Sequence, residues 1–175
     1  MFRILFFCFL FISFAVTGQI GPRTWEDHLS INSCNSVTKS GNTIYASYGN
    51  GIIYFEDSEV SPRTLNKING LNDVGVRVVR ANPHNKKVLV VYDNFNIDVI
   101  DAQGNISNYS DIKLKTFSGR KIVNDITFSK HLAYLACGFG IVVFDTERLE
   151  ILDTYVIGKN GAYLEVKQVA LTDSL

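Results

Sequence analysis

The sequence predicts an all-β fold, a β-propeller of four-stranded blades that are each about 45 residues long. Three segments of the chain align with one another, at residues 44–56, 88–101 and 133–145. They begin 44 and 45 residues apart, and no helical periodicity lies between them. Such a period without helices is typical of propeller blades, and a plain β-sandwich is the alternative fold.

The first repeat predicts four strands in order. The innermost is expected at residues 36–39, the second at 43–48, the third at 52–56 and the fourth within 60–68. Gly49-Asn50-Gly51 is expected to close a tight hairpin between the second and third strands, because Gly and Asn tolerate positive φ.

The other repeats follow the same plan. Tyr48, Tyr92 and Cys137 correspond across the three copies. Stretches at residues 78–81 and 125–129 are expected to form the innermost strands of the second and third blades. A further stretch at 168–172 would begin a fourth. Three blades and the start of a fourth cannot close a ring, since propellers need about four to eight blades.

The N-terminus predicts export. Arg3 precedes an apolar run at residues 4–16, and small residues follow it up to Gly18. This pattern is typical of a cleaved signal peptide at 1–18, and residues 19–175 would then be the N-terminal part of a longer, truncated propeller. A membrane anchor is the alternative, but the run is short of the roughly 20 residues that span a bilayer.

Composition excludes some classes of protein. The 175 residues carry 17 Lys and Arg against 17 Asp and Glu, so a nucleic-acid partner is not expected. The 46% hydrophobic content is that of a globular fold. Beyond the leader, Cys34 and Cys137 are expected to be two buried thiols, with a disulfide as the alternative.

No motif for catalysis, a cofactor or a metal is visible, so the sequence does not predict an enzyme. The histidines, His28, His84 and His131, are expected at strand ends or in loops. Asp93, Asn94, Asn96, Asp98 and Asp101 form a polar run, but their spacing does not fit an EF-hand. The alternation around Asp98 instead predicts a strand with one solvated face.

Two features could bind a ligand. Trp25 lies outside the repeats and could stack on a sugar ring. The connection after the second repeat holds four basic residues, which we call the basic connection: Lys113, Lys115, Arg120 and Lys121. A solvated loop is the simple interpretation, and a rim that binds an anionic polysaccharide is the alternative.

The chain resembles a known family in several runs. Leu65-Asn66-Lys67-Ile68-Asn69-Gly70-Leu71-Asn72-Asp73 resembles the joint between blades of the two-component-regulator propeller repeat. Trp25-Glu26-Asp27-His28-Leu29-Ser30 and residues 34–37, 45–51 and 137–145 are similar to the PorZ family of the Bacteroidetes type IX secretion system. The resemblance covers the chain from about Gln19 onward, but only the front of the family's length.

This resemblance implies a function. Members of the family carry two propellers and a C-terminal sorting domain, and they lie at the cell surface, associated with the outer membrane. They act with a sortase and outer-membrane partners in the attachment complex, which joins cargo to anionic lipopolysaccharide. A noncatalytic role in that complex is therefore expected. The alternatives are a periplasmic sensor propeller of a hybrid two-component histidine kinase, or an enzyme with its site in later blades.

Overall fold

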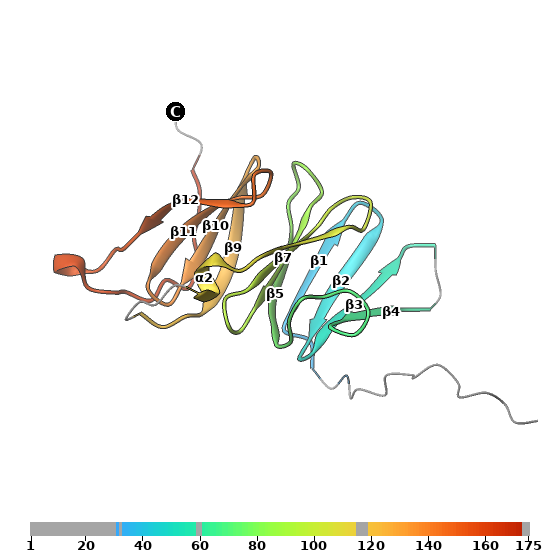
Figure 1. Ribbon diagram of the computed structural model, residues 1–175. Coiled ribbons are helices and arrows are strands. Elements are labelled where there is room, and N and C mark those ends of the chain that lie inside the picture. The colour runs from blue at the N-terminus through green and yellow to red at the C-terminus, as the bar shows by residue number, and fades with distance from the viewer. Residues whose placement is uncertain (1–30, 32, 59–60, 115–118, 173–175) are drawn as a thin grey trace, which may run out of the picture. The chain divides into compact units, whose positions relative to one another are not determined.

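The structure is a computed structural model that describes residues 31, 33–58, 61–114 and 119–172. These residues form three four-stranded antiparallel sheets, with little helix (Figure 1). In each sheet the hydrogen-bonded order follows the order of the strands in the chain. The all-β propeller prediction is therefore confirmed, while the predicted signal peptide at 1–18 and Trp25 lie outside the described residues.

The first blade contains β1 (Ser36–Ser40), β2 (Thr43–Tyr48), β3 (Gly51–Glu56) and β4 (Arg63–Asn66). Each of these strands lies where the sequence predicts it, to within a residue at the ends of the first three. The first three strands pair in simple antiparallel register, and β4 pairs with β3 over four residues.

The second blade contains β5 (Val76–Ala81), β6 (Val88–Tyr92), β7 (Ile97–Ile100) and β8 (Ile106–Tyr109). A short helix, α2 (Asp111–Leu114), follows it. The sequence does not predict this helix, because four residues are too few to show a helical period. Every residue of β6 is buried, as its continuous apolar run predicts.

The third blade contains β9 (Val123–Ser129), β10 (Leu132–Cys137), β11 (Gly140–Asp145) and β12 (Glu150–Tyr155). Tyr48, Tyr92 and Cys137 each end the second strand of their blade, which confirms the alignment of the repeats.

The hairpin at Gly49 and Asn50 forms as predicted, but for a different reason. None of residues 49–51 has a positive φ. A Cβ atom at Gly51 would instead lie 2.4 Å from the carbonyl oxygen of Leu65 on β4. Glycine is therefore required here by the close approach of the fourth strand, not by the turn.

Residues 168–172 do not form the predicted fourth inner strand. They have no strand partner within the described ranges. The extended segment still contacts the third blade, because Thr127 Oγ1 donates to the carbonyl of Val169 at 2.7 Å. A bond of the same kind joins the inner strands of the first two blades, from Ser36 Oγ to the carbonyl of Val79 at 2.8 Å. The segment therefore lies where an inner strand would, but without a sheet.

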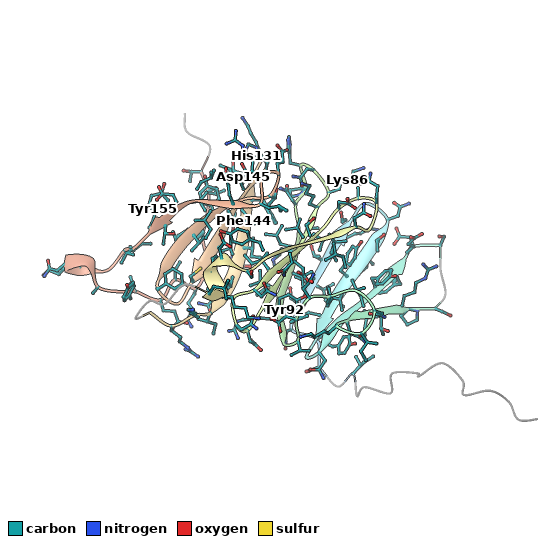
Figure 2. The ribbon with its side chains drawn as sticks, in the orientation of Figure 1. Lys86, Tyr92, His131, Phe144, Asp145 and Tyr155 are labelled. Carbon is teal, nitrogen blue, oxygen red and sulfur yellow. The ribbon has the colours of Figure 1, made fainter. Side chains whose placement is uncertain are left out.

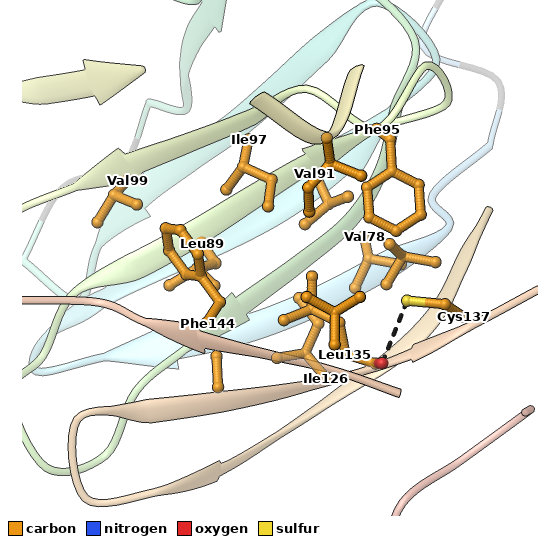
Figure 3. Packing of buried hydrophobic residues seen from close by; sticks show 14 of the residues in the cluster. Val78, Leu89, Val91, Phe95, Ile97, Val99, Ile126, Leu135, Cys137 and Phe144 are labelled. Carbon is orange, nitrogen blue, oxygen red and sulfur yellow. Dashed lines mark hydrogen bonds between the residues drawn. The ribbon is translucent and has the colours of Figure 1, made fainter. Parts of the chain in front are cut away.

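Apolar side chains hold neighbouring blades together. The larger cluster joins the second and third blades and includes Leu89, Ile97, Leu135 and Phe144, all fully buried (Figure 3). The smaller cluster joins the first and second blades through residues such as Ile52, Val79, Val88, Val90 and Tyr92. Burying a side chain of this size stabilises a fold by roughly 1.5–3 kcal/mol, so these faces are the main source of stability.

Candidate functional site

The hairpins between second and third strands lie at the same end of the sheets as the connections between blades. Backbone hydrogen bonds join the two sets, from Val76 N to Gly49 O at 3.2 Å, from Asp93 N to Gly75 O at 2.9 Å, and from Gly138 N to Ile122 O at 2.9 Å. We call this the connection end. It carries the described part of the basic connection.

The basic connection is partly occupied by internal partners. Lys113, on α2, donates from Nζ to Asp73 Oδ2 at 2.6 Å. Lys121 donates from Nζ to the carbonyl of Lys113 at 3.0 Å. Arg120 is exposed, and Lys115 lies outside the described residues. An anion that approached Lys113 would therefore have to compete with Asp73.

Asp73 anchors this connection to the hairpin of the second blade. The residue is 6% exposed, and its Oδ2 also accepts from Asn94 Nδ2 at 2.7 Å. Burial alone would raise the pKa of Asp73, but the hydrogen bonds from Lys113 and Asn94 outweigh it and lower the pKa to about 2. The carboxylate is therefore charged, and its hydrogen bonds hold the connection and the hairpin of the second blade together.

Asp98 lies in a second polar network, where the sequence predicts a solvated strand face. That prediction is wrong, because all of β7 is buried and Asp98 is 0% exposed. Its carboxylate accepts from Asn72 N at 2.9 Å and from Asn108 Nδ2 at 2.7 Å. The hydroxyl of Tyr92, labelled in Figure 2, also donates to it. Burial, and then the acceptor Asp98, raise the pKa of Tyr92, so its hydroxyl keeps the proton that it donates.

The carboxylate oxygens of Asp98 and Asp101 in the polar run already accept hydrogen bonds from the protein, which disfavours calcium binding there. The oxygens of Asp98 face protein donors, and Asp101 accepts from the backbone and side chain of Asn105. In the described part of the chain no group of three or more His, Cys, Asp or Glu side chains is arranged to hold a metal ion.

A polar hollow lies at the inner strands, and sequence motifs did not point to it. Its volume is about 570 Å³. It is lined by Cys34, Asn35, Arg77, Val78, Asp93 and Asn124. We call it the inner-strand hollow. Its residues come from the segment before β1 and from the second and third blades, so only the fold brings them together.

Two arginines of β5 have different surroundings. Arg77 lines the inner-strand hollow and donates from Nε to the carbonyl of Val123 at 2.7 Å. Arg80 is bound more tightly, to Asp125 Oδ1 at 2.9 Å and to Ser36 Oγ at 3.2 Å. Arg80 therefore joins three inner strands, whereas Arg77 has its head group at the edge of the hollow.

Cys34 and Cys137 are unpaired, as expected, but only one of them is buried. Cys137 is fully buried, and burial raises the pKa of its thiol to about 12. Cys34 is exposed beside the inner-strand hollow, so the prediction of a second buried thiol is wrong. The residue lies just before β1, where no neighbouring blade covers it among the described residues.

Two histidines lie in turns, as expected. His84 is exposed between β5 and β6, and His131 lies between β9 and β10 with Nε2 3.7 Å from Asp145 Oδ2 (Figure 2). His28 lies outside the described residues. Asp145 also accepts from the backbone N–H of Glu147 at 2.8 Å, so it caps the turn after β11.

No helix within the described ranges is both long and apolar enough to cross a bilayer.

Comparison with known structures supports the fold and identifies relatives. PorZ of Porphyromonas gingivalis, described as an essential surface component of the type IX secretion system, superimposes with a TM-score of 0.68 at 24% identity, over 73% of this chain and 17% of PorZ. The extracellular domain of the system BT4673 from B. thetaiotaomicron has a TM-score of 0.57 at 11% identity, over 77% of this chain and 18% of that one. The designed protein Ika4 has a TM-score of 0.59 at 14% identity, over 86% of this chain and 85% of its own.

The matched region is thus a small part of the natural relatives. No curated protein sequence matches the chain significantly. The family model for the N-terminal β-propeller domain of PorZ, from the type IX secretion system, matches residues 44–174, which run from the second residue of β2 to beyond β12. The chain therefore belongs to the family of PorZ N-terminal β-propellers, which are components of the type IX secretion system.

Proposed function

We propose that this chain is part of a noncatalytic, surface-exposed component of the type IX attachment complex, where it helps to join cargo to anionic lipopolysaccharide. The observation that carries the proposal is the family match over residues 44–174. Its partners would be the sortase and outer-membrane proteins of that complex, and it would lie at the cell surface.

The chemistry of the described residues supports a binding role. A general acid or base needs an oxygen or nitrogen within hydrogen-bond reach of its substrate. The buried carboxylates Asp73, Asp98 and Asp145 instead accept hydrogen bonds from protein donors. The exposed polar groups at the connection end, by contrast, are of the kinds that bind sugars and anions.

A binding assay with the purified full chain tests this proposal. Anionic lipopolysaccharide and neutral lipopolysaccharide from the same organism are immobilised separately, and binding is followed over a range of salt concentrations. We expect selective binding of the anionic form that weakens as salt rises. Equal binding of the two forms, or none, would contradict the lipopolysaccharide role.

A second assay addresses the protein partners. The full chain is used as bait for the sortase, with a propeller outside this family as the control bait. We expect retention of the sortase by this chain alone. If the chain binds lipopolysaccharide but does not retain the sortase, the proposed role in the attachment complex is contradicted. The proposed binding of lipopolysaccharide would still stand.

The similarity to the extracellular domain of BT4673, which is also described as a putative hybrid two component system, favours one other function, a periplasmic sensor propeller of a hybrid two-component histidine kinase. The two functions predict different sequences downstream of the propeller in the gene. A membrane-spanning helix of about 20 residues followed by kinase motifs would favour the sensor. Further blades and a compact β-rich C-terminal domain would favour the secretion component.

A further inference from the structure

The inner-strand hollow has the size of a small-molecule site and a polar lining. Its volume of about 570 Å³ lies within the ~300–1,000 Å³ that is typical of ligand pockets. Val78 is its one aliphatic lining residue, and the others carry polar atoms: Cys34, Asn35, Arg77, Asp93 and Asn124. Such a lining suits a ligand rich in hydroxyl groups better than an apolar one.

Arg77 supplies the positive charge of the hollow. Its Nε bond to Val123 fixes the plane of the guanidinium, while the side chain stays 32% exposed. Its Nη2 makes no hydrogen bond with any described residue, and Nη1 reaches Asp93 Oδ1 only at 3.4 Å. An exposed pair this long contributes little stability. The guanidinium is thus held in place with donors left for a carboxylate or a phosphate.

The amides supply groups for hydroxyls. The side chain of Asn35 has no hydrogen bond within the described residues, and the residue is exposed. Asn124 uses Nδ2 to reach the carbonyl of Val166 at 2.7 Å, which orients its Oδ1 as an acceptor. A sugar hydroxyl can both donate and accept, so it can pair with either amide.

Two acidic residues lie near the hollow and act differently. Asp93 is 66% exposed and is the nearest competitor for Arg77. Glu165 accepts from Asn124 at 3.2 Å, but Lys167 pairs with it at 2.7 Å and is the main cause that lowers its pKa. The carboxylate of Asp93 is therefore the one that an anionic ligand must displace.

We propose that the inner-strand hollow binds one anionic sugar residue, with its carboxylate or phosphate on Arg77 and its hydroxyls on Asn35 and Asn124. This inference rests on the proposed function, because it assigns the anionic saccharide of that function to one site. It also separates that site from the basic connection, where Lys113 is already paired with Asp73.

The test measures binding of small probes to the purified full chain by calorimetry or NMR. The probes are glucuronic acid, glucose 1-phosphate and, as the neutral control, glucose. Arg77→Gln should weaken binding of both anions at least tenfold, and Asp93→Asn should strengthen it several-fold. Arg148→Gln is the matched control, because the Arg148 side chain is 73% exposed and its ion pair with Glu150 is 3.5 Å long. Arg148→Gln should leave the affinity for all three probes unchanged.

Thermal unfolding of each variant shows whether the fold is intact. Glucose that binds as well as glucuronic acid overturns the proposal, as does unchanged affinity in a folded Arg77→Gln variant. The ratio of the two anion affinities then tells whether the site takes a sugar acid or a sugar phosphate.

Anionic lipopolysaccharide separates this inference from the proposed function. If Arg120→Gln with Lys121→Gln abolishes its binding while Arg77→Gln does not, the hollow is not the site, but the proposed function stands. If glucuronic acid needs Arg77 and the lipopolysaccharide does not bind at all, the hollow is a sugar-acid site and the proposed function fails.

Discussion

The two interfaces between blades both contain an apolar cluster, but they differ in chemistry at one equivalent strand position. Asp98 and Val142 are equivalent, since each lies two residues before the last aligned apolar residue of its third strand, Ile100 or Phe144. Both face the preceding blade. Val142 is part of the apolar cluster between the second and third blades, whereas Asp98 accepts hydrogen bonds at the first interface.

The difference shows how one repeat can hold its neighbours in two ways. Apolar burial is non-directional, so the interface around Val142 is held by area and fit. The network around Asp98 is directional, because donors from the connection and from β8 must meet the carboxylate oxygens. We infer that the network around Asp98 fixes the path of the connection at Asn72, while the apolar clusters supply more of the stability.

Placing a charge at the interface between the second and third blades should have the largest effect on stability. Val142→Asp would place a carboxylate in the apolar cluster, at a residue that is 2% exposed. We expect a loss of about 4–5 kcal/mol in the free energy of unfolding. Burial raises the pKa of the introduced carboxyl in the folded state, so the variant should be less stable at pH 8 than at pH 5. Urea unfolding at both pH values measures this.

Val142→Ala is the control, with a smaller loss that does not depend on pH. Equal stability of Val142→Asp at both pH values would mean that the carboxylate finds solvent or a partner. The two interfaces would then be more alike than their side chains indicate.

Removing the carboxylate of Asp98 should have the next largest effect on stability. Asp98→Ala leaves the buried hydroxyl of Tyr92 without its acceptor and takes an acceptor from the exposed Asn72, at a cost of about 3 kcal/mol. Asp98→Asn keeps one acceptor oxygen and should cost less. Urea unfolding measures both losses, and Glu56→Gln, at an exposed acid on β3, should stay within about 0.5 kcal/mol of the unmodified chain.

The ion pair between Asp73 and Lys113 predicts that the stability of the fold falls in acid. The pKa of Asp73 is about 2 in the folded chain against an ordinary 3.8, which corresponds to about 2 kcal/mol of stabilisation at neutral pH. Because the folded-state pKa is the lower one, this stabilisation is complete above about pH 4 and is lost as the pH falls toward 2. Stability measured from pH 5 to pH 2 should therefore fall less steeply in Asp73→Asn than in the unmodified chain.

NMR titration of the Asp73 carboxyl gives an independent measurement. In Lys113→Met the pKa of Asp73 should move up toward its ordinary value. An unchanged pKa would show that Asn94 and the backbone, not the ion pair, hold the carboxylate in its charged form.

The repeat made most of the fold predictable, because strand positions in a blade recur with the chain. The site was less predictable, because its contacts join residues far apart. Asp98 alternates with Ile97 and Val99 as on a solvated strand, yet Asn72, 26 residues away, covers it. Its alignment with Val142 was the signal that could have shown its burial. Arg77 and Asn124 lie in no motif, so only the meeting of inner strands reveals their hollow.

The smallest expected effect comes from two neighbouring glycines of the first hairpin. A Cβ atom at Gly49 meets nothing within 4 Å, while one at Gly51 would lie 2.4 Å from Leu65 O. Gly51→Ala should therefore cost about 1–2 kcal/mol, since β4 must move away from β3. Gly49→Ala should be neutral within about 0.5 kcal/mol. Amide hydrogen exchange in β4 gives the sharper readout, because protection there should fall only in Gly51→Ala. Equal effects of the two changes would mean that the turn, and not the approach of the fourth strand, requires glycine.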